Sequence, residues 1–345
     1  MATVLHREDF KRGVFERDSN KCVACSKNAV DAHHLIDRSL WDDGGYYIDN
    51  GVSLCSSCHV KAEQTILSNK ELRELAGISK RHLPDHFDPT HEYDHWGNII
   101  LPSGIRFKGE LFYEDNVQKV LKQAKLLEYF SPYVKYPRTY HLPKSPNLQN
   151  DDRKHTNVDF FEGQYVVATI KRDGENTSMY SDYIHARSLD SKHHPSRDWV
   201  KALHGRIKHD IPDGWRICGE NLYAKHSILY KNLPGTFFEV FSMWDKNNVC
   251  ISWQDTELYC EILGLTPVPT FYRGGWNPDL IQKAFEIYVN RSEDEVEGYV
   301  VRIEKAFPYK DFRRCTAKYV RKNHVQTSEF WMTQPVVPNK LKEAQ

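Results

Sequence analysis

The stretch QYVVATIKRDGENTSMYS, residues 164–181, decides how the larger part of this sequence folds. The apolar and β-branched residues 165–170 are typical of a strand, and Asp173-Gly174 after them is typical of a turn. Similar short runs follow, separated by turn residues: YIHARS (183–188), WRICGE (215–220), GTFFEVFSMW (235–244), VCISW (249–253) and EGYVVRI (297–303). Helical spacing of apolar residues recurs at 197–207 and 278–290. The pattern predicts an α+β domain with antiparallel sheets.

The length of 345 residues and the content of 40% hydrophobic side chains predict two folded units. A polar stretch with two prolines, RHLPDHFDPTHEYDH, ends at residue 95 and indicates a boundary there. We therefore expect four segments: a small module (1–95), a lead-in with a helix near 111–129 and a Pro-rich stretch (96–162), a core domain (163–335) and a tail (336–345).

The formal net charge is zero, so the chain carries no global basic signature of nucleic-acid binding. Residues 1–100 contain 12 basic and 16 acidic side chains, and any surface for RNA or DNA must therefore be a local patch. No run of about 18 apolar residues is present, and the N-terminal MATVLHREDFKRG is charged where a signal peptide is apolar. We expect a cytoplasmic protein without a membrane partner, from a bacterium or encoded by a phage.

Lys171, at the end of the first strand-like run, is the sharpest candidate for chemistry. A lysine between a strand and a turn lies at the mouth of a cleft, where it can attack a phosphorus atom. It must first be deprotonated, and neighbouring cations or a metal lower its pKa from the ordinary value of about 10.4. The alternative is a surface β-turn, because K-x-D-G is a frequent tetrapeptide.

Five further segments follow Lys171 in a fixed order: HARS (185–188), GENLYAKHSI (219–228), TFFEVFSMWD (236–245), EGYVVRI (297–303) and AKYVRKNHV (317–325). With Lys171, this set resembles the covalent nucleotidyltransferase superfamily of ligases and mRNA capping enzymes, and GENLYAKHSI and KYVRKNHV resemble its RNA ligase branch. The resemblance covers residues 100–335. It implies an ATP-grasp-like antiparallel-sheet domain, ATP and magnesium as cofactors, and the joining of 5′-phosphate to 3′-hydroxyl ends of RNA or DNA.

The resemblance also implies roles for the residues around the nucleophile. Lys171 would form the phosphoramidate with AMP, and Asp173 and Gly174 would hold its loop. Lys318 and Arg321 would engage the α-phosphate and stabilise the negative charge that develops as pyrophosphate leaves.

Other matched positions would bind the nucleotide. Arg187 would contact the nucleic acid or a phosphate, and Glu220 the ribose hydroxyl. Phe238 would stack on adenine, with Phe241 as the alternative, because strand alternation points the two rings to opposite faces. Glu297 would coordinate magnesium, a cation that takes few protein ligands and keeps several waters.

Two features distinguish this sequence within the superfamily. It has Val240-Phe241-Ser242 where many ligases have Phe-Asp, and its last motif has Lys and Arg where others have two lysines. Only 24 residues follow Arg321, too few for the OB-type domain that follows this motif in DNA ligases and capping enzymes. The RNA ligase branch resembles the two motif variants, and the short segment after Arg321 argues against the DNA ligase and capping enzyme classes.

The first 95 residues contain two C-x-x-C pairs, Cys22/Cys25 and Cys55/Cys58, with 29 residues between them. Two such knuckles provide the four thiolates of a tetrahedral zinc site. A redox-active dithiol is the alternative reading for a single pair. Two pairs in so short a segment favour structural zinc.

His33, His34, Asn50 and His59 lie between and after these pairs, in an order that resembles the HNH nuclease family. The resemblance implies a ββα-metal fold in which His33 and His59 bind a catalytic divalent ion. His34 would be the general base for a water, and Asn50 would orient the loop. The alternative is a module that only holds nucleic acid. Three functions are therefore open: an RNA ligase with this added module, an HNH nuclease with a ligase-like substrate-binding domain, and a non-enzymatic nucleic-acid-binding protein.

Overall fold

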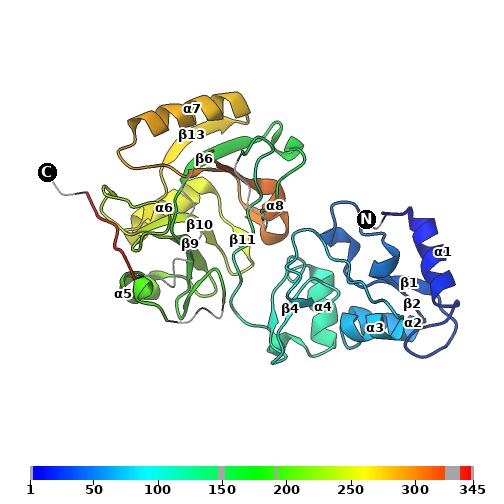
Figure 1. Ribbon diagram of the computed structural model, residues 1–345. Coiled ribbons are helices and arrows are strands. Elements are labelled where there is room, and N and C mark those ends of the chain that lie inside the picture. The colour runs from blue at the N-terminus through cyan, green and yellow to red at the C-terminus, as the bar shows by residue number, and fades with distance from the viewer. Residues whose placement is uncertain (1–2, 147–151, 190, 192, 323–334, 343–345) are drawn as a thin grey trace. The chain divides into compact units, whose positions relative to one another are not determined.

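The computed structural model describes residues 3–146, 152–189, 191, 193–322 and 335–342. The chain forms two compact units, residues 1–134 and 135–345, each with its own hydrophobic core (Figure 1). Residues 323–325 of the last predicted motif lie outside the described residues. Among the described helices, none has the length and apolar character that a membrane span requires.

The first unit contains the expected ββα arrangement, formed by β1, β2 and α2 after an initial helix α1. Its elements are α1 (Arg7–Arg17), β1 (Asp31–His34), η1 (Arg38–Leu40), η2 (Ile48–Asn50), β2 (Gly51–Leu54), α2 (Ser56–Glu63), α3 (Asn69–Leu75), β3 (Glu92–Tyr93), β4 (Ile99–Ile100), β5 (Arg106–Phe107), α4 (Asp115–Gln123) and η3 (Leu127–Tyr129). Strands β1 and β2 pair antiparallel, and α2 follows β2 directly. Helix α1 packs Phe10 against Gly51, where a Cβ atom would lie 2.5 Å from the Phe10 ring.

Residues after 95 complete the core of this first unit. Strands β3, β4 and β5 form a small antiparallel sheet. Trp96 and Val117 are buried in one cluster with Leu40 of η1. A buried ion pair, Arg106 to Asp94 at 2.9 Å, crosses the sheet and supplies the partner that a buried carboxylate needs. The sequence-based boundary at residue 95 therefore lies inside a compact unit that continues to residue 134.

The second unit contains two sheets. Its elements are η4 (Asp159–Phe161), β6 (Tyr165–Lys171), β7 (Glu175–Met179), β8 (Ile184–Ala186), η5 (Pro195–Arg197), α5 (Asp198–Ile207), η6 (Lys208–Asp210), β9 (Arg216–Asn221), β10 (Phe238–Trp244), β11 (Val249–Cys250), α6 (Trp253–Leu263), β12 (Thr266–Pro267), β13 (Thr270–Gly275), α7 (Pro278–Arg291), β14 (Gly298–Ile303), β15 (Phe307–Pro308), η7 (Tyr309–Asp311), α8 (Phe312–Cys315) and β16 (Thr316–Val320). One sheet has the order β13-β6-β14-β16 and the other β15-β11-β10-β9-β7-β8, with β12 parallel to β10. Every other strand pair is antiparallel, so the predicted α+β class is confirmed.

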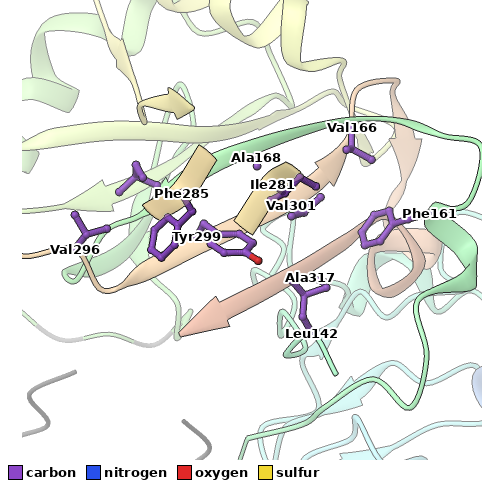
Figure 2. Packing of buried hydrophobic residues seen from close by; sticks show 11 residues of the cluster. Leu142, Phe161, Val166, Ala168, Ile281, Phe285, Val296, Tyr299, Val301 and Ala317 are labelled. Carbon is purple, nitrogen blue, oxygen red and sulfur yellow. The ribbon is translucent and has the colours of Figure 1, made fainter. Parts of the chain in front are cut away.

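Helix α7 covers the four-stranded sheet. Asn277 caps it by accepting hydrogen bonds from the backbone N–H groups of Asp279 and Leu280, and Pro278 occupies its first turn, a combination that favours a helix start. The helix buries Ile281 and Phe285 against residues of β6, β14 and β16 (Figure 2). This packing holds rigidly the strand that ends at Lys171.

The register of the four-stranded sheet brings distant parts of the sequence together. Lys171 on β6 faces Gly298 on β14, and Lys318 on β16 faces Val300 on the other side of β14. A Cβ atom at Gly298 would lie 1.9 Å from the carbonyl oxygen of Tyr319, so only glycine fits this close approach of β16. Two lysines 147 positions apart in the sequence therefore lie one strand apart in space.

Candidate active sites of the two units

Lys171 is the last residue of β6, and its ammonium group contacts a carboxylate. Its Nζ lies 2.5 Å from Oε2 of Glu297. Burial lowers the pKa of Lys171, but the charges of Glu297 and Glu220 raise it by more, so the pKa lies above the ordinary value. In this arrangement the lysine is an ammonium ion at neutral pH. A neutral Lys171 amine would require a ligand that offsets this negative charge.

Arg172 anchors the loop after Lys171 on one side. Its Nε and Nη2 donate to the two carboxylate oxygens of Glu239 at 2.7 and 2.9 Å, and both side chains are buried. Such a bidentate pair fixes both position and orientation. Removing either partner would leave a buried charge unpaired, at a cost of about 3–5 kcal/mol.

Asp173 anchors the same loop on the other side. Its Oδ2 accepts hydrogen bonds from the backbone N–H groups of Ser227 and Ile228 at 2.7 and 2.6 Å, and its own N–H donates to the Tyr230 hydroxyl at 2.9 Å. The next residue, Gly174, donates to Glu220 Oε1 at 3.1 Å, and a Cβ atom there would lie 2.5 Å from the Asn221 carbonyl oxygen. Asp173 and Gly174 therefore tie this loop to residues 220–230.

A cavity of about 260 Å³ opens beside Lys171. Glu220 on β9 lies opposite Asn176 on β7, and both line the cavity. Burial raises the pKa of Glu220 to about 8, because removal from water disfavours the carboxylate and Glu297 adds negative charge. Asn176 Oδ1 is buried and has no hydrogen-bond partner among the described residues. A water or a donor on a bound molecule can complete a buried acceptor at the wall of a cavity.

Lys318 lies at another wall of this cavity. Its Nζ donates to Asp152 Oδ1 at 2.9 Å, and His141 Nε2 lies 3.1 Å from the same oxygen. Burial lowers the pKa of Lys318, and the Asp152 carboxylate only partly compensates. Two lysines therefore approach one cavity, each beside a carboxylate.

The four cysteines of the first unit form one cluster. The Sγ atoms of Cys22, Cys25, Cys55 and Cys58 all lie within 4.8 Å of one another. A hydrogen bond from Ser57 lowers the pKa of Cys55 to about 6, so this thiol is largely a thiolate at neutral pH. Four converging thiols, one of them ionised, fit a metal ion.

A cavity of about 310 Å³ in the same unit is lined by His33, His34, His59 and His95. The His33 ring lies 4.9 Å from His59 and 4.5 Å from His95, centroid to centroid. The Nε2 atoms of His33 and His34 are buried, and no described residue forms a hydrogen bond with either. Burial lowers the pKa of His34 to about 4, so its ring is neutral at pH 7, as a general base must be.

Asn50 holds the loop that leads to this cavity. Its Nδ2 donates to the carbonyl oxygens of Ile36 and Gly45 at 3.1 and 3.0 Å, and its Oδ1 accepts from the Ile36 N–H at 3.0 Å. All three of these hydrogen bonds of the Asn50 amide are made with backbone groups. The structure therefore gives Asn50 the loop-holding position expected from the sequence.

Two family models match this chain. The RNA ligase model matches residues 164–320, which contain Lys171 and most of its cavity, and the HNH endonuclease model matches residues 22–65, which contain the four cysteines. The chain contains an RNA ligase domain and an HNH endonuclease domain. The architecture expected from the sequence is thereby confirmed. No curated protein matches the sequence.

Solved structures of ligases are similar to the chain at low identity. An archaeal ATP-dependent RNA ligase is 16% identical over 55% of this chain and 48% of that chain, with a TM-score of 0.35. The Naegleria gruberi RNA ligase with PPi is 14% identical over 85% of this chain and 74% of that chain, with a TM-score of 0.36. The present chain thus spans about half the length of the archaeal ligase. The domain assignment rests on the family models.

The structure separates the two phenylalanines proposed for adenine stacking. Phe238 is fully buried in the core of the RNA ligase domain with Met179 and Val200, so it has no face open to a ligand. Phe241 lines the cavity. The β9–β10 register shifts between Val240 and Ser242, which makes Phe241 the extra residue of a β-bulge and redirects its side chain. The burial of Phe238 argues against it as a stacking residue and leaves the alternative, Phe241, as the candidate.

The other predicted residues of the RNA ligase domain fall into two groups. Arg187 lines the cavity along with Lys171, Glu220 and Lys318. Arg321 follows β16, and its backbone N–H donates to the Glu297 carbonyl oxygen at 3.0 Å, but its side chain is not part of the cavity wall in the described structure.

Asp152 and His95 line the two cavities but were not predicted from the sequence. Asp152 belongs to the Pro-rich lead-in, where a single acidic residue has no distinguishing pattern. His95 lies outside the residues matched by the HNH model. Its Nδ1 lies 2.8 Å from the His34 carbonyl oxygen, a contact that only the fold reveals.

Proposed function

We propose that this chain is an ATP-dependent RNA ligase that joins 5′-phosphate and 3′-hydroxyl ends through a lysyl-AMP intermediate on Lys171. The observation that carries the proposal is the cavity beside Lys171. It combines two lysines, a carboxyl group of raised pKa and the unpartnered acceptor of Asn176 within the RNA ligase domain.

The proposed reaction has three steps. The Lys171 amine attacks the α-phosphorus of ATP, forms a P–N bond and releases pyrophosphate, while Lys318 stabilises the charge on the α-phosphate. A 5′-phosphate oxygen then takes AMP from Lys171, which gives an activated end with a pyrophosphate linkage. Finally a 3′-hydroxyl attacks the activated phosphorus, forms the phosphodiester and releases AMP.

Magnesium fits the acidic side of this cavity. Glu297 is not part of the cavity lining, but its Oε2 contacts the Nζ of Lys171, which is, and its carboxylate is the one that would hold the ion. When bound, the ion would supply positive charge that offsets the carboxylates and favours the neutral Lys171 amine. Glu220 would bind the ribose hydroxyl, and Arg187 a phosphate of the nucleic acid.

Sealing assays on nicked duplexes of defined composition test the substrate class. We expect joining when the strand that supplies the 3′-hydroxyl is RNA, and a lower rate when it is DNA. Equal rates on all-DNA and RNA-containing nicks would contradict an RNA ligase and favour a general polynucleotide ligase.

Phe241→Ala is expected to weaken ATP binding. Loss of a stacking ring costs about 0.5–1.5 kcal/mol, so the KM for ATP should rise by up to about tenfold. The matched variant Phe238→Ala removes a core ring instead and should lower stability by about 3–5 kcal/mol. Steady-state kinetics and thermal unfolding distinguish the two effects. An unchanged KM in Phe241→Ala would refute the stacking role.

We further propose that the HNH endonuclease domain cuts nucleic acid, with zinc as a structural ion in the cysteine cluster. The supporting observation is the pair of buried, unpartnered Nε2 atoms of His33 and His34 at one cavity. His33 and His59 would hold a divalent ion, and the neutral His34 would take a proton from the attacking water. Cutting and sealing would then serve one pathway, in which cleavage makes an end for the ligase.

His34→Ala is expected to lower the rate of nicking of RNA or DNA by about 10²- to 10⁴-fold, the contribution of a general base. Sealing by the other unit should stay within about twofold of wild type. His91→Ala, which changes a histidine of the same unit outside the cavity lining, is the control. Gel assays of supercoiled and single-stranded substrates measure nicking. Equal nicking by wild type and His34→Ala would refute the proposed nuclease role of this site.

A further inference from the structure

Asn339 near the C-terminus connects three backbone groups of one distant loop. The residue is 3% exposed. Its Oδ1 accepts a hydrogen bond from the Tyr230 N–H at 2.8 Å, and its Nδ2 donates to the Leu222 carbonyl oxygen at 2.8 Å. Its backbone N–H donates to the Tyr223 carbonyl oxygen, also at 2.8 Å. Both polar ends of the Asn339 side chain therefore form hydrogen bonds with the loop between β9 and β10, within its residues 222–233.

The residues around Asn339 bind the same loop, and we call segment 335–342 the strap. Pro338 and Leu341 form bridges with Ala224 and Leu233. Leu341 also packs on the small buried cluster Leu222, Ile228, Tyr230 and Leu233. The loop is not part of either sheet, so its buried backbone groups need partners from elsewhere, and the strap provides them.

The loop in turn holds the segment that follows the nucleophile. The hydroxyl of Tyr230 accepts a hydrogen bond from the N–H of Asp173 at 2.9 Å. The N–H groups of Ser227 and Ile228 donate hydrogen bonds to the Asp173 carboxylate. Tyr230 is 1% exposed, so its hydroxyl can move only if its backbone moves. Asn339 binds that backbone, and Asp173 is two residues from Lys171.

We propose that Asn339 is a positioning residue for nucleotidyl transfer to Lys171, acting through Tyr230 and Asp173. The inference rests on the ligase function proposed here. Within the described structure, no strap residue lines the ATP cavity. The strap therefore affects the geometry of attack and leaves the affinity for ATP largely unchanged.

Asn339→Leu tests this inference, because leucine has a similar size but makes neither side-chain hydrogen bond. The rate of lysyl-AMP formation at saturating ATP is expected to fall by about 10- to 100-fold, the effect of a small misplacement of reacting groups. The KM for ATP should stay within about twofold. Lys340→Ala, which removes an exposed side chain of the strap, should match wild type in both parameters. Assays run well below the unfolding midpoint of each variant exclude simple loss of folded protein.

A double-mutant cycle adds a readout that a merely structural role would not move. Tyr230→Phe removes the acceptor for the Asp173 N–H without altering the strap. If Asn339 acts through Tyr230, the double variant should be about as slow as the slower single variant. Multiplied effects, or a full rate in Asn339→Leu, would overturn the inference. Absence of lysyl-AMP in wild type would instead refute the ligase function itself.

Discussion

Lys171→Ala should give no labelled protein band after incubation with magnesium and α-radiolabelled ATP, where wild type gives one. In the proposed reaction Lys171 supplies the atom that bonds to phosphorus, and loss of a covalent nucleophile lowers a rate by at least about a thousandfold. Denaturing gel electrophoresis followed by autoradiography measures the covalent label. Lys305→Ala, which changes an exposed lysine of the same unit, is the control and should label as wild type does.

Lys171→Arg separates nucleophilic attack from the ion pair with Glu297. Arginine keeps the positive charge beside that carboxylate, but its pKa above about 12 leaves no neutral nitrogen to attack ATP. We expect a folded and unlabelled protein. Labelling of either Lys171 variant at the wild-type rate would place the reactive lysine elsewhere, and the second lysine of the cavity, Lys318, would be the residue to test next.

Part of the cavity beside Lys171 could be predicted from sequence pattern, and part only from the resemblance to RNA ligases. Lys171 ends a run of apolar and β-branched residues, and the turn after it is fixed by Gly174, where a side chain does not fit. Glu220 and Lys318 were assigned only through the resemblance to RNA ligases, and the structure places them on β9 and β16. Antiparallel pairing then brings such positions together without further information from the loops.

The choice between Phe238 and Phe241 shows where that reasoning stops. Strand alternation says that two residues three apart point to opposite faces, but it does not say which face is the cavity. The β-bulge at Val240–Ser242 depends on the partner strand β9, so no pattern within β10 reveals it. Packing in the fold shows which ring faces the core, because Phe238 is completely buried.

Residues that act across long sequence distances were missed for a related reason. Trp96 and Val117 have the apolar character of core residues, yet the sequence does not say that they pack against Leu40. Asn339 lies in a short polar tail that reads as a simple terminus, and its three hydrogen bonds join it to residues more than a hundred positions earlier. Local sequence patterns do not reveal partners that lie so far apart in the chain.

Metal removal should unfold the HNH endonuclease domain and leave the RNA ligase domain active. Four thiolates that bind zinc contribute on the order of 10–16 kcal/mol of folding free energy, as much as the whole stability of a typical domain. The double variant Cys22→Ser/Cys55→Ser removes one ligand from each knuckle. We expect loss of bound zinc and loss of hydrogen-exchange protection in β1 and β2. Labelling of Lys171 should stay within about twofold of wild type.

The cysteines also pack in the core with Val52 and Leu54, so serine substitution alone confounds a lost ligand with a poorer core. Chelation of wild-type protein keeps every side chain and removes only the ion. If unfolding is a metal effect, chelated wild type and the double variant should lose protection alike, and added zinc should restore only the former. Ser56→Ala, between the two cysteines of the second knuckle, should retain zinc. Full protection in chelated, zinc-free wild type would show that packing alone holds this fold.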